Sequence, residues 1–360
     1  MSFRERIRIG DELISHQEVV DGVKVIFGLA KQSNLSLSFF EATWALAAWC
    51  FHQRQVDWVI WEVGLGGRLD ATNTCEPILS AITSISLDHT HILGHSLTEI
   101  ATEKSPIYRE HGIALTACKN EALEALLSVS VVKPLSIEDS IQNLEDYYQD
   151  WLNVNDSKTL ALSLTGSLMM SQHGRRNLAL ALRCAKELAW LNEQDINHPN
   201  INDLISLKWP GRLEFQEGIW LDCAHNPDSA HYLSEWLKQQ QAPRHLILGM
   251  SADKDISEFL FILAQHCEKI TFVSPRYPRC TSAESLADIF ELKVSPTLIS
   301  KLGAAYLPSI FIEPNLSQAL CDRDLSALNL VSGSCFLVGE ARSLLLGLDF
   351  PELALSTSAR

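Results

Sequence analysis

Short apolar segments alternate with amphipathic ones along the second half of the chain, and this alternation limits the folds that are available. Short runs rich in β-branched residues are typical of strands buried in a sheet. Most are followed by stretches in which apolar residues recur at helical spacing. Such β/α alternation predicts a mostly parallel sheet with right-handed connections. The expected strands are residues 219–223, 245–250, 269–274, 309–313 and 334–338, and the expected helices are 228–240, 255–266 and 282–291.

The first half shows the same two patterns less regularly. Residues 120–170 lack a periodic pattern, so we expect an irregular excursion there. Pro210 and Gly211 break helix and strand alike, which predicts a boundary between a domain of residues 1–209 and a smaller domain of residues 210–360. Helices are predicted at residues 39–53, 96–110 and 171–190, and strands at 56–61, 80–86 and 113–116.

Composition supports two cores and argues against some partners. The chain has 360 residues, of which 46% are hydrophobic, and this is enough for two domains. The net charge of −15 and the lack of a Lys/Arg-rich block argue against a nucleic-acid surface. The start has no apolar signal region, and no run approaches the roughly 18 apolar residues of a membrane span. We therefore expect a soluble, cytoplasmic protein with no membrane partner.

The cysteines carry no pairing signal. There are 9 of them, scattered and without a Cys-x-x-Cys pair. An odd number without such spacing is typical of small buried side chains in a reducing compartment. We therefore expect neither disulfides nor a zinc site.

Residues 62–73, which read EVGLGGRLDATN, carry the strongest functional signal. They follow the apolar run 56–61, which we interpret as a buried strand. Glu62 would then stand at the carboxyl end of a strand, where open α/β sheets place their ligands. Glycines let the backbone turn tightly and approach a ligand, while Arg68 and Asp70 add polar groups. The alternative is a Gly-rich connection in which Asp70 only caps the turn.

Residues 88–91, which read DHTH, also follow a predicted strand. Adjacent strands would bring Glu62 and His89 together, and a carboxylate with a neutral imidazole can hold a divalent cation that also takes water and phosphate. A structural histidine is the alternative; for zinc, no further ligand stands at suitable local spacing. Lys104 would extend into solvent, balance charge beside the metal, or be carbamylated to a carboxylate.

Three polar segments mark the predicted sheet of the second half. Residues 222–227 (DCAHNP) and 249–255 (GMSADKD) end predicted strands, and residues 332–334 (SGS) precede a third. Asn226 and Pro227 begin the next helix in the usual way. Because ligands bind outside the carboxyl ends of parallel strands, these segments predict one functional edge.

Taken together, these stretches resemble the folylpolyglutamate synthase/dihydrofolate synthase family, a branch of the Mur-type ATP-dependent amide ligases. Their order follows the family across nearly the whole chain, and the 62–73 loop with the later Leu-Asp-His is the most specific part. The matching stretches are residues 38–41, 62–73, 83–94, 103–104, 177, 210–212, 222–227, 249–255 and 333–334.

The resemblance implies an α/β fold, with a P-loop-type domain like the central domain of Mur ligases followed by a smaller Rossmann-like domain. It implies that ATP phosphorylates a carboxylate of a pteroate or folate, and that the amine of L-glutamate then displaces phosphate to give the amide. Such a step depends on positioning and on charge neutralisation by metal and arginine. The implied ligands are ATP, L-glutamate, dihydropteroate or folate, and Mg²⁺, and we expect a monomer.

The resemblance also assigns roles to individual residues. Glu62 and His89 would bind Mg²⁺, with Lys104 as a carbamylated catalytic lysine. His225 and Ser334 would meet the incoming glutamate. Contacts with ATP would fall on Asn177, Arg212 and Asp222, and contacts with the pterin on Ser38, Phe39, Phe40, Glu41, Leu69, Asp70 and Ala71.

Two features depart from the family. No G-x-x-x-x-G-K-[ST] pattern occurs in the sequence, and neither Gly22 nor Gly28 is followed by Lys-Ser/Thr. We therefore expect an N-terminally truncated first domain, because the family's first strand, phosphate-binding loop and following helix would precede Met1. Ser105 and Pro106 follow Lys104 where the family has Ala-Gly, and proline removes a donor and stiffens that turn.

Three classes of function compete. The first is a ligase of this family whose start is truncated or misassigned. The second is an inactive remnant or a non-catalytic relative that binds folate or a partner after losing its triphosphate site. The third, a Rossmann-type oxidoreductase, is disfavoured because residues 64–67 lack the G-x-G-x-x-G spacing that leads into a helix.

Overall fold

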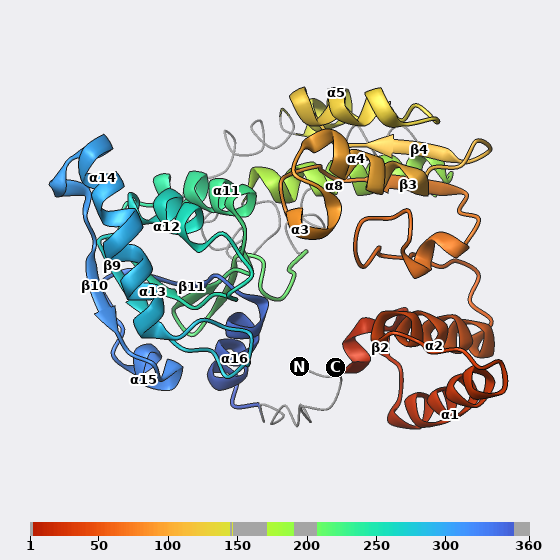
Figure 1. Ribbon diagram of the computed structural model, residues 1–360, viewed down its shortest axis with the longest axis horizontal. Coiled ribbons are helices and arrows are strands. Elements are labelled where there is room, and N and C mark those ends of the chain that lie inside the picture. The colour runs from red at the N-terminus through yellow and green to blue at the C-terminus, as the bar shows by residue number, and fades with distance from the viewer. Residues whose placement is uncertain (1–2, 145, 147–170, 191–206, 349–360) are drawn as a thin grey trace. The chain divides into compact units, whose positions relative to one another are not determined.

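The computed structural model describes residues 3–144, 146, 171–190 and 207–348. Backbone contacts divide the chain into two compact units, residues 1–136 and 137–360, each with its own sheet (Figure 1). The boundary predicted at residues 209–212 falls inside the second of these units. A boundary between two functional domains at these residues stays a prediction.

The second unit is built on a six-stranded sheet in the order β10-β9-β8-β11-β7-β6. All neighbouring strands are parallel except β6 and β7, which confirms the predicted mostly parallel sheet. Strand β11 pairs with β7 on one side and β8 on the other, so these three strands lie side by side. The strands are β6 (Glu214–Gln216), β7 (Ile219–Leu221), β8 (Arg244–Leu248), β9 (Lys269–Phe272), β10 (Ser309–Ile312) and β11 (Leu328–Ser332).

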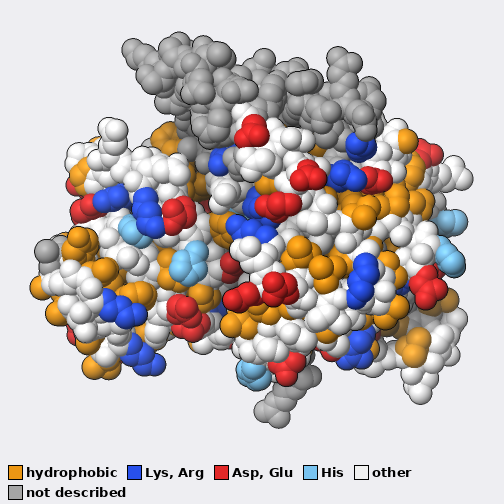
Figure 2. Space-filling view, turned by 90° about the horizontal axis from the view of Figure 1, so that it is seen from above, with side chains coloured by type: hydrophobic (Ala, Val, Ile, Leu, Met, Phe, Trp, Pro, Cys, Tyr) orange, Lys and Arg blue, Asp and Glu red, His pale blue; other side chains and the backbone are white. Residues whose placement is uncertain are grey.

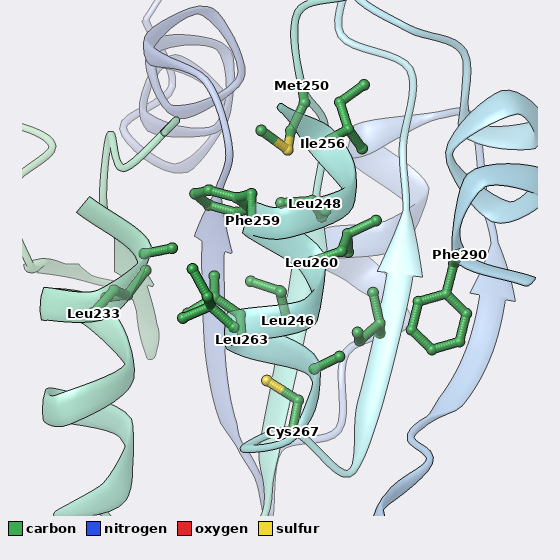
Figure 3. Close-up of a cluster of buried hydrophobic side chains, with 14 of the residues drawn as sticks. Leu233, Leu246, Leu248, Met250, Ile256, Phe259, Leu260, Leu263, Cys267 and Phe290 are labelled. Atoms are coloured by element: carbon green, nitrogen blue, oxygen red, sulfur yellow. The ribbon is translucent and has the colours of Figure 1, made fainter. Parts of the chain in front are cut away.

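Helices cover both faces of this sheet, because successive side chains of each buried strand point to opposite faces. Leu246 and Leu248 of β8 pack into the cluster formed with α11, α12 and α13, while Ile247 packs with α15 and α16. Figure 3 shows Leu246 and Leu248 against Phe259 of α12. The helices of this unit are α8 (Gln172–Glu187), α11 (Pro227–Lys238), α12 (Ile256–Ala264), α13 (Ala283–Ile289), the π-helix η5 (Phe290–Val294), α14 (Ser295–Leu302), η6 (Ala304–Tyr306), α15 (Leu316–Cys321) and α16 (Cys335–Leu345).

The first unit contains a three-stranded parallel sheet, β3-β4-β5, and a helical hairpin, α1 with α2. The hairpin encloses buried Ile26, Leu46 and Cys50. Both of its helices begin with a capping box, which satisfies backbone N–H groups that a helix start leaves unpaired. The strands are β1 (Arg8–Ile9), β2 (Glu12–Leu13), β3 (Leu79–Ile82), β4 (Ile113–Thr116) and β5 (Leu135–Ser136); the helices are η1 (Phe3–Arg6), α1 (His16–Gln32), α2 (Phe39–Arg54), η2 (Ala71–Thr74), α3 (Thr90–Leu93), α4 (Leu97–Lys104), η3 (Ser105–Ile107) and α5 (Asn120–Val129).

The buried strand predicted at residues 56–61 is wrong. These residues form no strand, and Ile60 has 85% of its surface exposed, with Trp58 and Val59 also exposed. A strand needs a neighbour for its N–H and C=O groups, and β3 pairs only with β4 among the described strands. Glu62 is therefore not at a strand end, and its side chain is exposed.

Two further predictions are corrected. Residues 334–338 are not a strand: the strand is β11, which ends at Ser332, and Cys335 begins α16. The polar segment 332–334 therefore follows a strand rather than preceding one. Residues 120–129 form the helix α5 rather than an irregular excursion, while most of the remainder of 120–170 lies outside the described residues.

No helix among the described residues is long and apolar enough to span a membrane. On the face seen in Figure 2, acidic and basic side chains are interspersed. The predictions of a cytoplasmic location, a monomeric state and no nucleic-acid partner stay predictions.

Candidate functional site

The Gly-rich loop of the first unit is organised by one carboxylate. Asp70 Oδ2 accepts hydrogen bonds from the backbone N–H groups of Gly64 (3.0 Å) and Leu65 (3.1 Å). Its Oδ1 accepts from the Thr72 N–H (3.0 Å) and hydroxyl (2.6 Å). Asp70 thus caps its own turn at Thr72 and also fixes the start of the loop at Gly64 and Leu65, and its contact with the pterin stays a prediction.

The loop is also fastened to the end of α4. Arg68 forms an ion pair with Glu103 (Nη2 to Oε1, 2.9 Å), and its N–H donates to the Glu103 carbonyl (2.8 Å). Gly67 packs so closely against this helix end that a Cβ would lie 3.0 Å from the Lys104 carbonyl oxygen and 2.7 Å from Ile107 Cγ2. Only glycine fits at such a contact, so the loop and Lys104 are held together.

Lys104 is the last residue of α4 and is partly buried. Burial lowers the pKa of its ammonium, opposed by the carboxylate of Asp88. A neutral amine is the form that reacts with carbon dioxide, so the lowered pKa favours the chemistry implied for this lysine. Pro106 is accommodated because it lies inside the short 3₁₀ turn η3, where its missing N–H is not needed.

His89 is held in a strained backbone conformation. Its φ is 50° and its ψ is 37°, which lie in the left-handed region that residues other than glycine seldom adopt. Its N–H donates to Asp88 Oδ1 (2.8 Å), and its Nε2 lies 4.0 Å from the same oxygen. Strain of this kind is concentrated at functional sites. The Gly-rich loop lies against α3, since a Cβ on Gly66 would lie 3.0 Å from Leu93 Cδ2.

Among the described residues, no group of three or more His, Cys, Asp or Glu side chains could hold a metal ion. Mg²⁺ is often bound through one or two protein oxygens, with water and phosphate completing the shell. Binding of Mg²⁺ by Glu62 and His89 stays a prediction.

The predicted pterin residues fall into two groups. Ser38 and Glu41 form the capping box of α2, with Glu41 Oε2 accepting the Ser38 N–H at 2.7 Å. Two of the apolar members are exposed instead: Phe39 has 65% and Leu69 81% of its surface accessible. Phe40 joins the two segments, because its ring packs on Gly64, where a Cβ would lie 2.6 Å away. Ala71 begins η2, which lies beside α2.

The second unit brings the segments after β7, β8 and β11 together at one edge of the sheet, as predicted for the first two. The Gly333 N–H donates to the Ala224 carbonyl (2.9 Å), which joins the end of β11 to the segment after β7. On its other side, a Cβ on Gly333 would lie 2.8 Å from the Gly249 carbonyl oxygen, after β8. With φ at +106° as well, position 333 requires glycine.

Asp222 is fixed at this edge and lies near Arg212. Its Oδ2 accepts the Leu213 N–H and its Oδ1 the Ala224 N–H, both at 2.9 Å. Burial raises the pKa of this carboxyl, while the two N–H bonds and the charge of Arg212 oppose the rise. Arg212 itself is exposed. A fixed carboxylate next to an accessible guanidinium suits a ligand with hydroxyl and phosphate groups.

Asn177 on α8 is linked to this edge through His173. The Asn177 Nδ2 lies 3.1 Å from His173 Nε2, and the His173 ring packs on Tyr232 of α11 at 4.7 Å between centroids. Burial lowers the pKa of His173, and the nearby charge of Arg212 adds to this effect. His173 thus links Asn177 to Tyr232 of α11, and the assignment of Asn177, Arg212 and Asp222 to a nucleotide stays a prediction.

His225 and Ser334 follow the ends of β7 and β11. His225 is partly buried, and its Nδ1 lies 2.8 Å from the Cys223 carbonyl oxygen. A hydrogen bond with the Cys335 side chain raises the pKa of the His225 imidazole. Ser334 is buried and caps α16, accepting the Phe336 N–H at 3.1 Å. Ser334 therefore has a structural role at the start of α16, and its contact with glutamate stays a prediction.

Comparison with known proteins decides the family. Residues 211–320 match the family described as Mur ligase, glutamate ligase domain. The chain is 32% identical over 329 residues to the dihydrofolate synthase/folylpolyglutamate synthase of Bacillus subtilis (strain 168), covering 81% of this chain and 72% of that protein. This chain belongs to the folylpolyglutamate synthase/dihydrofolate synthase family. It is thereby a member of a family of ligases, as predicted.

Solved structures agree with this assignment. The bifunctional folylpolyglutamate synthase/dihydrofolate synthase of Yersinia pestis, complexed with AMPPNP and Mn ion, has a TM-score of 0.72 and 26% identity, covering 97% of this chain and 80% of that one. A structure of such an enzyme with Mn, AMPPNP and L-glutamate bound has a TM-score of 0.70 and 25% identity, covering 96% and 80%. The predicted α/β Mur ligase fold is confirmed.

Several residues at the same edge were not predicted from the sequence. His173 was missed, because its contacts come from α11 and from the segment at Arg212. Glu214 pairs with Arg342 of α16 (2.9 Å) and accepts the Gly211 N–H (2.8 Å). In the sequence, the position of Glu214 two residues after Arg212 was the feature that could have indicated its place at this edge. Cys335 was expected to be buried, yet it is exposed at the start of α16.

Proposed function

We propose that this chain is an ATP-dependent amide ligase that adds L-glutamate to dihydropteroate or to tetrahydrofolate and its polyglutamates through an acyl phosphate. The observation that carries the proposal is the cluster of Arg212, Asp222 and His225 at the carboxyl edge of β7 and β11. Family membership supplies the reaction class. The cluster supplies a reason to assign the nucleotide and glutamate steps to these side chains.

Asn177, Arg212 and Asp222 would contact ATP. The Asp222 carboxylate, held by two backbone N–H groups, would present a fixed acceptor to ribose hydroxyls. The exposed Arg212 guanidinium would pair with phosphate oxygens, which it can do through two hydrogen bonds at once. Holding the nucleotide in one orientation lowers the barrier to in-line transfer.

His225 would meet the carboxylates of the incoming L-glutamate. Its raised pKa favours the cationic imidazolium, which attracts an anionic substrate. Ser334 would act in part through the turn that it caps, by fixing the start of α16. Orienting the amine of glutamate toward an acyl phosphate is the contribution expected from these two residues.

The folate would contact Phe39 and Leu69, the two exposed apolar residues of the predicted pterin group, with Ser38, Phe40, Glu41, Asp70 and Ala71 forming their support. Exposed aromatic and aliphatic side chains that face a ligand contribute binding energy when they are covered. Because Asp70 and the capping box are engaged with backbone groups, we assign them to shaping this surface.

Glu62 and His89 would hold Mg²⁺ together with water and nucleotide phosphate. When bound, the ion would neutralise phosphate charge. Lys104, carbamylated, would add a carboxylate beside it. The lowered pKa of Lys104 and the strained backbone of His89 are the observations that support this assignment.

A binding experiment tests the nucleotide assignment. ADP is titrated calorimetrically into the wild-type chain and into Arg212→Ala, with Arg244→Ala as the matched control at the opposite end of the sheet. Loss of a charged hydrogen bond of about 1.5–3 kcal/mol predicts roughly 10- to 100-fold weaker binding for Arg212→Ala. Equal affinity in all three proteins would refute the assignment.

An activity experiment tests the reaction. The polypeptide is incubated with ATP, L-glutamate and either dihydropteroate or tetrahydrofolate, and the amide product and ADP are measured. The proposal predicts amide product that depends on both ATP and L-glutamate.

The outcomes separate the candidate functions. Turnover by the 360-residue polypeptide would support the ligase. ADP binding without turnover would favour the non-catalytic or inactive relative.

A further inference from the structure

The turn that carries Arg212 has a backbone conformation that the chain seldom adopts. Gly211 and Leu213, the residues on either side of Arg212, have φ of +70° and +46°. Leucine rarely takes a positive φ, and such backbone persists only where the surrounding structure enforces it. Leu213 is buried in a hydrophobic cluster of the second unit, whereas Arg212 is exposed. An exposed guanidinium therefore extends from a constrained backbone.

Two carboxylates hold this turn, one on each side of Arg212. Before Arg212, the Gly211 N–H donates to Glu214 Oε2 (2.8 Å). After it, the Leu213 N–H donates to Asp222 Oδ2 (2.9 Å). Both carboxylates come from the place where β6 and β7 meet, because Glu214 begins β6 and Asp222 directly follows β7. The backbone N–H groups of both neighbours of Arg212 are thus fixed.

Glu214 is itself held by α16. Arg342, in the last turn of α16, has its Nε 2.9 Å from Oε1 and 3.1 Å from Oε2 of Glu214. The Gln216 side-chain amide also donates to Oε1 (3.2 Å). Glu214 is buried and Arg342 partly buried, and hydrogen bonds between ionised groups are stronger than neutral ones. Each oxygen of Glu214 therefore has a protein donor.

The turn also packs closely against the same helix. A Cβ on Gly211 would lie 3.1 Å from Cγ1 of Val338, which belongs to α16, and 2.7 Å from Cys223 Sγ. The Gly211 carbonyl accepts the Cys223 N–H (2.9 Å). Helix α16 thus fixes the turn at two points, by contact at Val338 and through the pair of Arg342 with Glu214.

We propose that Glu214, held by Arg342, is a positioning residue for Arg212. It keeps the turn in one conformation, so that the guanidinium is already oriented when it meets a nucleotide phosphate. This role rests on the proposed function, in which Arg212 pairs with phosphate oxygens of ATP. A guanidinium on a mobile turn would have to be ordered on binding, and this ordering weakens affinity. Glu214 does not contact the nucleotide itself, since its negative charge would repel phosphate.

Two other roles for the pair of Glu214 and Arg342 predict different results. If the pair only joined α16 to β6, its loss would lower stability and leave nucleotide affinity unchanged. If the side chains acted through their charges, loss of the Glu214 anion would strengthen ADP binding, and loss of the Arg342 cation would weaken it. A positioning role predicts weaker binding from either loss, because each one frees the turn.

Calorimetric titration of ADP into the full chain separates these roles. Glu214→Gln and Arg342→Gln should each weaken binding about threefold to tenfold, the range expected for ordering one flexible side chain. Glu268→Gln is the matched control, because Glu268 pairs with Arg244 and accepts its backbone N–H at the opposite end of the sheet. This control should change affinity by less than about twofold. Unchanged or tighter binding by Glu214→Gln would overturn the proposal.

A double-mutant cycle shows whether Glu214 acts through Arg212. Adding Glu214→Gln to Arg212→Ala should not weaken ADP binding further, because no guanidinium is left to position. A further loss as large as that of Glu214→Gln alone would overturn the proposal, since Glu214 would then act by another route.

Hydrogen exchange tests the turn without nucleotide. Mass spectrometry of peptides that contain residues 211–213 should show faster exchange in Glu214→Gln and Arg342→Gln than in wild type or Glu268→Gln. Unchanged exchange would overturn the proposal. If thermal melting shows that Glu214→Gln or Arg342→Gln does not fold, Arg342→Lys replaces it. That variant keeps the charge but not the planar fork, so it should still weaken ADP binding, which an effect of charge would not do.

The same titrations distinguish failure of this role from failure of the proposed function. If Arg212→Ala binds ADP as tightly as wild type, the nucleotide assignment of Arg212 is wrong and the positioning role falls with it. If Arg212→Ala binds ADP more weakly while Glu214→Gln and Arg342→Gln bind it like wild type, the nucleotide assignment stands and only the positioning role is overturned.

Discussion

Two polar regions of this chain, one in each unit, are built in different ways. In the second unit, the segments after β7, β11 and β8 are positioned by sheet pairing and by backbone hydrogen bonds such as that from Gly333 to Ala224. In the first unit, the Gly-rich loop has no strand before it. It is held by side chains, chiefly Asp70 and the pair of Arg68 with Glu103.

The difference predicts where each region is fragile. A loop that continues from buried strands is held by many backbone hydrogen bonds. Substitution of a single polar side chain is therefore tolerated, unless the position requires a special backbone conformation. A loop organised by one carboxylate depends on that residue, because the loss leaves several N–H groups without their acceptor. Stability measurements on matched variants can therefore distinguish the two designs.

The largest effect is expected at Gly333 in the sheet-supported edge. A Cβ there would meet Leu248 Cδ1 at 2.6 Å and the Gly249 carbonyl oxygen at 2.8 Å, with φ at +106°. Gly333→Ala should lower the free energy of unfolding by about 3 kcal/mol or more, through strain and overpacking. Urea denaturation followed by circular dichroism measures it.

Gly218→Ala is the matched control. Its φ is +80°, but nothing lies within 4 Å of its Cβ position. It should lose only about 1 kcal/mol, the cost of a left-handed conformation. Similar losses at both positions would show that the close contacts at the edge contribute nothing.

The next effect is expected at Asp70 in the side-chain-supported loop. Asp70→Ala removes the acceptor of four hydrogen bonds, from Gly64, Leu65 and two groups of Thr72. We expect a loss of about 2 kcal/mol in unfolding free energy, since water can reach part of the freed loop. Asp57→Ala, at an exposed position just before the loop, should be nearly neutral. If the two variants are equally stable, the loop does not depend on its carboxylate.

Acid should weaken the second unit through a buried histidine. His245 lies between Asn329 Oδ1 (2.9 Å) and Thr271 Oγ1 (2.8 Å), and burial lowers its pKa to about 4. The unfolded chain takes up a proton near pH 6.5, so the stability is present above that pH and is lost as pH falls toward 4. From pH 7.5 to 5.5 this amounts to about 1.4 kcal/mol.

His245→Gln, which does not titrate, should lack this part of the pH dependence even if it is less stable at every pH. Urea midpoints of both proteins at the two pH values give the comparison. Parallel pH dependence in the two proteins would assign the acid effect to other groups.

The elements of the sheet-supported unit follow well from the sequence. The strands expected at 219–223, 245–250, 269–274 and 309–313 correspond to β7, β8, β9 and β10, because short apolar runs between helical patterns have few other folds available. The same logic places Asp222 and His225 at one edge, whereas Arg212 was assigned by the resemblance alone. Helix α1, by contrast, was missed, although Ser15 and Glu18 carry the capping-box signature.

The errors have physical causes. The run 56–61 has strand-like composition, but composition does not reveal whether a partner strand lies alongside. The run after Ser334 is short and apolar, which fits strand and helix alike, and only the positive φ of Gly333 and the Ser334 cap decide for a helix. His173 was missed as a site residue because its partner Tyr232 is distant in sequence.

The smallest effect is expected from the ion pair of Arg68 and Glu103, and it sharpens the comparison. The two side chains are 48% and 24% exposed, and exposed pairs contribute about 0–1 kcal/mol. The Arg68 N–H bond to the Glu103 carbonyl survives truncation of the side chain. Arg68→Ala should therefore lose less than about 1 kcal/mol, and less still in 1 M salt, where charges are screened over about 3 Å. Arg54→Ala, which removes an ion pair with Glu18 of comparable exposure in the same unit, is the control. A loss at Arg68 as large as that at Asp70 would mean that the loop is held by two side chains of equal weight, and that the single-carboxylate description is wrong.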